Sequence, residues 1–110
     1  MKNLLTVALL LCSFPAMAVD VDALRAKAIK GDYQAQRNLA YTLSTGSGSA
    51  NSLNPMLGCA WYKVILLSGS EKVNDGDVGN VKVYCGRLTA DQHGVADKQA
   101  RKLVKQIYGD

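Results

Sequence analysis

Apolar positions recur at helical spacing along most of the chain. Residues 33–44 place four of them on one helix face: Ala35, Leu39, Ala40 and Leu43. Residues 55–67 are apolar nearly all round, which predicts the most buried helix. The segment after Thr89 has the cleanest stripe: Ala96, Ala100, Leu103, Val104 and Ile107. A shorter helix is expected over residues 23–30.

Capping residues delimit these segments. Side chains that accept hydrogen bonds from free helical N–H groups precede them: Asp20 or Asp22, Asp32, Asn54, Asp77 and Thr89. Pro55 suits a first helical turn, and Gln92 completes a capping box with Thr89. Glycines that let the chain turn away end the first three helices: Gly31, Gly46 with Gly48, and Gly69.

The segment after Asp77 is ambiguous. Val78, Val81, Cys85 and Leu88 follow each other at steps of three, four and three, as on a helix, whereas "VKVYC" alone is compatible with a strand. The wider spacing and the capping aspartate favour a helix. We therefore expect an all-α chain of about five helices joined by short loops.

Residues 1–18 predict a cleaved signal peptide. A lysine is followed by a mainly apolar run too short to span a bilayer, and Ala16 and Ala18 suit cleavage after residue 18. The alternative is a lipoprotein with Cys12 as the lipidated residue, but Leu11 is too large for the preceding position. Residues 19–110 would then form a single domain in the periplasm, without a stable membrane anchor.

Cleavage changes the charge and the cysteine count. Removing Lys2 leaves 12 of the 13 basic residues against 9 acidic ones, with no basic run, which makes nucleic-acid binding a poor interpretation. Cys59 and Cys85 remain as an even pair, which favours a disulfide in an oxidising compartment. Closing that loop would contribute about 3 kcal/mol to stability.

A recurring pattern of small residues indicates repeated helical hairpins. Small residues at Ala28, Gly31 and Ala35, with Gly69 in the same role after the next helix, let paired helices approach closely and stack as a short α-solenoid. The sequence also resembles the Sel-one-like repeats, which are relatives of the tetratricopeptide repeats. The positions that carry the resemblance are Ala28, Gly31, Ala35, Leu39, Ala40, Leu43, Gly46, Gly48, Asn54, Gly58, Trp61, Tyr62 and Gly69.

The departures from that pattern are Ala40 for glycine, Leu43 for tyrosine and Gly58 for alanine. The closing segment, residues 88–103, looks like the helical tail of exported bacterial members. The resemblance implies a protein-interaction scaffold, and in some exported members of the family disulfides link the helices.

Catalytic and ligand-binding motifs are weak. The loop "TGSGSANS" lacks the lysine and the preceding strand of a phosphate-binding loop. Cys59 as a nucleophile would need a base, and His93, the single histidine, reads better as an exposed helical residue. Neither the three available Cys and His ligands nor the Asn74–Asp77 turn predicts a metal site, and we expect no cofactor.

The candidate partner-binding residues lie on two helices. Trp61 is expected to pack between helices, with the hydroxyl of Tyr62 nearer the surface. Lys98, Arg101, Lys102 and Lys105 form the polar side of the last helix, either a solvated face or a site for an anionic partner.

These patterns predict a periplasmic protein-binding module without catalytic activity, with an inhibitor or immunity protein against an envelope-targeted toxin as one form. A homodimer is also compatible with so small a solenoid. The alternative is a cell-wall-active or lactam-binding enzyme, as in cysteine-rich repeat relatives.

Overall fold

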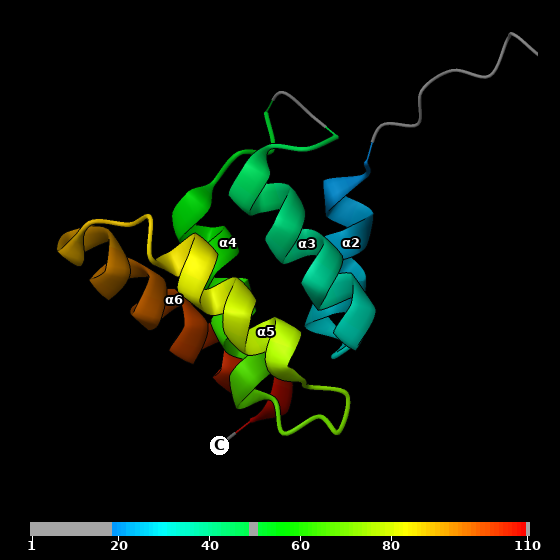
Figure 1. Cartoon of the computed structure of the whole chain (residues 1–110). Helices are drawn as coiled ribbons and strands as arrows, with labels where there is room; N and C mark the ends of the chain where they lie inside the picture. The colour runs from blue at the N-terminus through cyan, green and yellow to red at the C-terminus, as the bar shows by residue number, and fades with distance from the viewer. Residues whose placement is uncertain (1–18, 49–50, 110) are drawn as a thin grey trace, which may run out of the picture.

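The chain folds into helices throughout the part that the structure describes, residues 19–48 and 51–109 of a computed structural model (Figure 1). The elements are α2 (Val21–Ile29), α3 (Tyr33–Thr45), α4 (Pro55–Leu67), α5 (Asp75–Asn80), the π-helix η1 (Val81–Cys85) and α6 (Ala90–Tyr108). Because η1 continues α5 directly, five helical rods result, and the expected all-α fold is confirmed. The predicted signal peptide lies outside the described residues.

Most predicted caps form. The carboxylates of Asp20 and Asp32 accept from the N–H groups of Ala23 (3.0 Å) and Ala35 (2.8 Å). Asp20 is therefore the first cap, and Asp22 lies in the first turn. Asn54 caps α4, and Thr89 and Gln92 form the expected capping box on α6.

The prediction for the fourth helix was wrong in two respects. The helix begins at Asp75 with Asn74 as its cap, and Asp77 occupies the third helical position, where it accepts from the N–H of Asn74 at 3.0 Å. Val78, assigned to the apolar stripe, is 41% exposed. The π turn adds a residue to the helical repeat, so that Asp77 and Cys85 are the buried positions of this rod.

Helix α4 is the centre of the packing. This helix packs against α3 on one side and α6 on the other and also contacts α5 and η1, while α2 packs on α3. In Figure 1, the α5–η1 rod runs alongside α3 on the face toward the viewer. The predicted burial of α4 is confirmed, since its buried residues are Gly58, Cys59, Ala60, Trp61, Tyr62, Val64 and Ile65.

The positions that carry the repeat resemblance are structural. Those in the core with at most 4% exposure are Ala28, Ala35, Leu39, Ala40, Leu43, Trp61 and Tyr62. Those with positive φ, which suits a residue without a Cβ, are Gly31, Gly46, Gly48 and Gly69. Gly46 is the left-handed C-cap of α3, and its N–H donates to the carbonyl of Thr42 at 2.8 Å.

A disulfide joins α4 to the end of η1. Cys59 in α4 and Cys85 at the end of η1 are bonded, with Cα atoms 5.0 Å apart, as the pairing argument predicted. Both cysteines are buried and share a small apolar cluster with Ala96 of α6. The bond therefore links α4 to η1 where both pack against α6. Across residues 19–48 and 51–109, no helix has the length and apolarity to cross a membrane.

Candidate binding face

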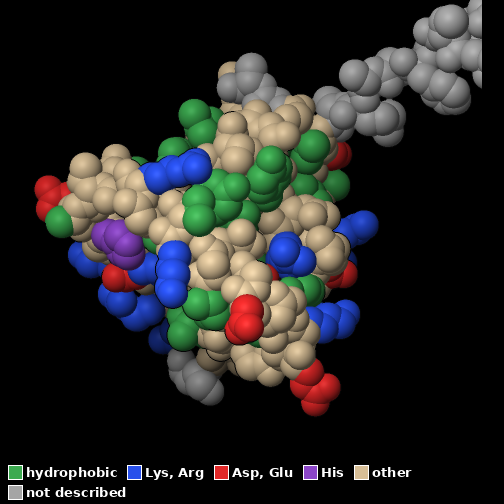
Figure 2. All heavy atoms as spheres, in the orientation of Figure 1, with side chains coloured by type: hydrophobic (Ala, Val, Ile, Leu, Met, Phe, Trp, Pro, Cys, Tyr) green, Lys and Arg blue, Asp and Glu red, His purple; other side chains and the backbone are tan. Residues whose placement is uncertain are grey.

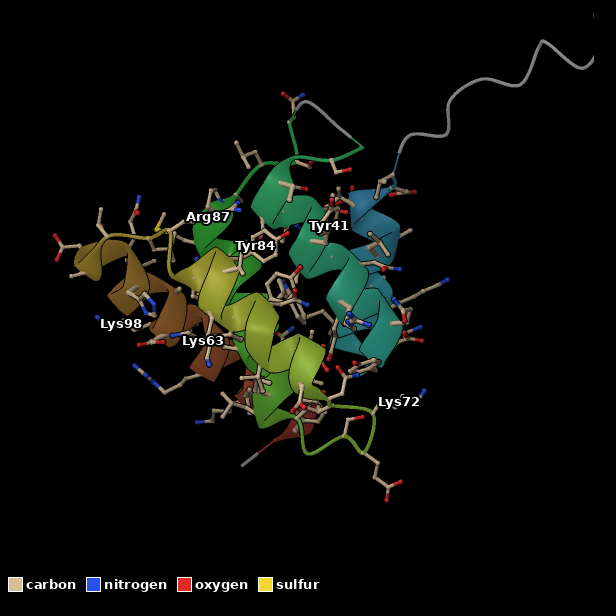
Figure 3. All side chains as sticks on the ribbon, in the orientation of Figure 1. Tyr41, Lys63, Lys72, Tyr84, Arg87 and Lys98 are labelled. Atoms are coloured by element: carbon tan, nitrogen blue, oxygen red, sulfur yellow. A yellow bond between two sulfur atoms is a disulfide. The ribbon has the colours of Figure 1, made fainter. Side chains whose placement is uncertain are left out.

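One face of α3 carries aromatic and basic side chains toward the α5–η1 rod. Tyr33, Arg37 and Tyr41 are spaced by four residues and therefore project from the same side of the helix. Figure 3 shows Tyr41 and Tyr84 reaching toward each other across the seam between α3 and η1, with Arg87 beside them. Figure 2 shows hydrophobic side chains gathered over this seam.

The seam contains a hollow of about 270 Å³, which we call the tyrosine hollow. Its lining comes from α3, α4, α5 and η1 and consists of Gln34, Arg37, Asn38, Tyr41, Tyr62, Asn80 and Tyr84. The ring of Tyr84 stacks on that of Tyr62, with centroids 5.2 Å apart, and meets Tyr41 edge to face at 6.4 Å. The guanidinium of Arg87 lies 4.9 Å from the centre of the Tyr84 ring.

Tyr62 does not reach the outer surface, contrary to the sequence-based expectation. The residue is only 2% exposed, because Tyr84 covers its ring. Burial, and then the neighbouring Tyr84, raise the pKa of Tyr62 to about 12. Tyr62 can therefore contact a partner only through the tyrosine hollow that it borders.

A buried aspartate closes one end of the seam. Asp77 is fully buried, and its Oδ2 accepts from the hydroxyl of Tyr33 at 2.6 Å, while Nε of Arg37 lies 3.2 Å from Oδ1. Burial, the hydrogen bond to Asp77 and the charge of that carboxylate raise the pKa of Tyr33. This network neutralises Arg37 and holds α5 against α3.

Positive charge is concentrated on η1 and α6. Residues 81–109 carry six basic and two acidic side chains, whereas the preceding residues from 19 on carry six of each. The predicted set on α6 is exposed and consists of Lys98, Arg101, Lys102 and Lys105. Lys and Arg side chains accordingly gather on the α6 side of the molecule in Figure 2. The structure thus places these four on a face separate from Tyr62.

His93 is less exposed than predicted. Its ring is partly buried, and Nζ of Lys63 lies 3.3 Å from Nδ1. Lys63 also donates a hydrogen bond to the carboxylate of Asp97. This hydrogen bond and the charges of Lys63, His93 and Arg101 lower the pKa of Asp97, whereas burial acts in the opposite direction. The sulfur of Cys59 is held in the disulfide and is therefore not a free thiol nucleophile. Among the described residues, no group of three His, Cys, Asp or Glu side chains could hold a metal ion.

The residues that sequence reasoning missed are Tyr41, Tyr84, Arg87, Asn38 and Asn80. The four-residue spacing of Tyr33, Arg37 and Tyr41 was a visible signal for a common face. No sequence signal indicated that Tyr84 contributes to this face, because its position depends on how η1 packs against α3.

Searches with this chain against family models, curated proteins and solved structures find no match.

Proposed function

We propose that this chain is a non-catalytic protein-binding module of the periplasm whose partner presents an acidic surface. The observation that carries the proposal is the charge segregation, in which residues 81–109 hold the entire basic excess of the described chain. Such a face accelerates association with an anionic partner and fixes its orientation. The resemblance to Sel-one-like scaffolds agrees with this role.

Helix α6 offers the most direct contact surface. Its basic side chains project from one rigid, capped element, whose apolar residues pack into the core. A rigid surface loses little conformational entropy on binding. An inhibitor or immunity protein against an envelope-targeted toxin is the form of this function that we favour, since it needs only such a surface.

The test is capture of a partner from envelope extract with residues 19–110 as bait. Lys98→Glu/Arg101→Glu should abolish capture, and raising the salt concentration should weaken capture by the unmodified chain. Lys27→Glu/Lys30→Glu makes the same change in net charge around α2 and serves as the control. Equal capture by both double variants would overturn the proposal. A small secreted hydrolase as the captured protein would support the inhibitor form.

A further inference from the structure

Asp97 is an acidic side chain within the basic stretch of α6. It precedes Lys98 directly and lies four residues before Arg101, a spacing at which an aspartate and an arginine can pair on a helix surface. Such a pair would neutralise Arg101, which belongs to the surface that the proposed acidic partner contacts. A free carboxylate at this position would therefore oppose the binding of that partner.

The carboxylate of Asp97 is bound by Lys63 of α4 instead of Arg101. Nζ of Lys63 donates a hydrogen bond to Oδ1 of Asp97. This hydrogen bond contributes most to the lowered pKa of Asp97 and the charge of Arg101 contributes least, while burial acts in the opposite direction. In the described part of the chain, no carboxylate lies within salt-bridge distance of Lys98, Arg101 or Lys102.

Lys63 competes well for Asp97 because its ammonium is largely shielded from solvent. The side chain of Lys63 is 18% exposed, and Figure 3 shows it reaching toward α6 on the side where Lys98 projects. Its Nζ also lies 3.3 Å from Nδ1 of His93, a contact in which the ammonium is the donor. An ion pair in such a partly buried place is stronger than one on the open surface of a helix.

We propose that Lys63 is a positioning residue for partner binding, which holds the carboxylate of Asp97 and so leaves Lys98, Arg101 and Lys102 as an uninterrupted cationic surface. This inference rests on the proposed function and deepens it, because it names a residue outside the contact surface that sets the charge of that surface. The partner group is a cluster of carboxylates. Arg101 can bind one of them through two parallel hydrogen bonds, which a lysine cannot do.

A purely structural role for the pair explains less. Helices α4 and α6 already pack through apolar side chains, and the disulfide cluster adds a second contact between them. An ion pair whose carboxylate is 43% exposed adds little to the stability of such a contact. Its effect on the charge of α6 is the larger consequence.

The test measures the binding of a fluorescently labelled oligoglutamate peptide to residues 19–110. Lys63→Met keeps the apolar part of the side chain and should weaken binding about threefold more than Lys72→Met does. Lys72→Met makes the same change in net charge at an exposed position between α4 and α5, on the opposite side of the molecule in Figure 3. Lys63→Arg should bind as the unmodified chain does. Equal weakening by the two methionine variants would overturn the inference.

A second substitution separates the position of the charge from the net charge. Lys63→Met/Asp97→Asn should restore the affinity of the unmodified chain, because the released carboxylate is gone. Lys63→Met/Asp75→Asn restores the same net charge through an exposed residue of α5 and should stay weak. If the two double variants bind oligoglutamate alike, the inference is overturned.

The side-chain Nε–H signal of Arg101 reports the rearrangement without any ligand. Asp97→Asn should shift this NMR signal more in the Lys63→Met background than in the unmodified chain, because only there does Asp97 pair with Arg101. Equal shifts in the two backgrounds would overturn the inference. Urea unfolding of each variant checks that it is folded.

The two proposals can fail separately in the same binding assay. If Lys98→Glu/Arg101→Glu binds oligoglutamate as tightly as the unmodified chain, the acidic-partner surface on α6 is wrong. If that variant loses binding while Lys63→Met and Lys72→Met weaken it equally, only the role of Lys63 is wrong.

Discussion

The hydroxyl of Tyr33 on α3 donates a 2.6 Å hydrogen bond to Asp77 on α5, 44 residues further along the chain. Asp77 also accepts from the N–H of Asn74, which caps its own helix, and pairs with Arg37. One carboxylate thus starts the short helix α5 and ties it to α3. A six-residue helix needs such tertiary support, because isolated short helices are marginal in water.

Replacing that carboxylate should therefore destabilise the fold. Asp77→Ala leaves the partly buried Arg37 and the hydroxyl of Tyr33 without their partner, and we expect a loss of about 3 kcal/mol. Urea unfolding followed by circular dichroism measures it. Asp75→Ala removes an exposed carboxylate from the same first turn and should cost less than about 1 kcal/mol. Equal losses would show that Asp77 acts only through the helix dipole.

The disulfide should supply a large share of the stability of so small a domain. Cys59→Ala/Cys85→Ala releases a link between positions 26 residues apart, and we expect a loss of about 3 kcal/mol in the free energy of unfolding. Fully reduced wild-type protein should lose a similar amount in the same urea assay. A thiol titration under denaturing, non-reducing conditions provides the check on the bond itself, and two free thiols would contradict it.

Local sequence signals predicted the first three helices and the last. Asp32, Asn54 and Thr89 cap helices where their sequence positions indicated, because capping is a contact within one turn. The pairing of Cys59 with Cys85 was predictable because only two cysteines remain when the predicted signal peptide is set aside. The π turn was not predictable, since no composition signal distinguishes "VKVYC" in a π-helix from the same residues in an α-helix.

The candidate binding face was only partly predictable. Helical spacing places Tyr33, Arg37 and Tyr41 together, but the seam exists only where α3 meets η1. The burial of Tyr62 depends on Tyr84, whose direction follows from the phase shift that the π turn introduces. Tertiary packing determines which of these side chains are buried, and the residue pattern within one helix does not predict that packing.

Gly58 should tolerate no larger side chain. A Cβ at Gly58 would lie 2.8 Å from the backbone nitrogen of Ser44 and would also overlap its hydroxyl, where α4 crosses α3. Gly58→Ala should therefore cost about 1–3 kcal/mol, measured by urea unfolding.

The matched control for Gly58→Ala is the same substitution in α6. A Cβ at Gly94 meets no atom within 4 Å, so Gly94→Ala should stabilise the domain by about 0.5–1 kcal/mol through helix propensity. Opposite signs for the two substitutions support close packing at Gly58. Stabilisation by both would show that α3 and α4 can separate to admit a methyl group.

The fold should lose stability at alkaline pH through Tyr62. Burial raises its pKa from 10.0 to about 12, with Arg37 acting in the opposite direction, so the folded chain holds this proton when the unfolded chain has released it. The contribution of this raised pKa to the free energy of unfolding is complete below pH 10 and is lost as the pH rises to about 12. A shift of this size corresponds to on the order of 2 kcal/mol. Tyr62→Phe has no proton to release, so its free energy of unfolding should fall less between pH 9 and pH 12 than that of the wild type. Identical pH profiles would show that solvent entering the tyrosine hollow hydrates the phenolate and relieves the effect of burial.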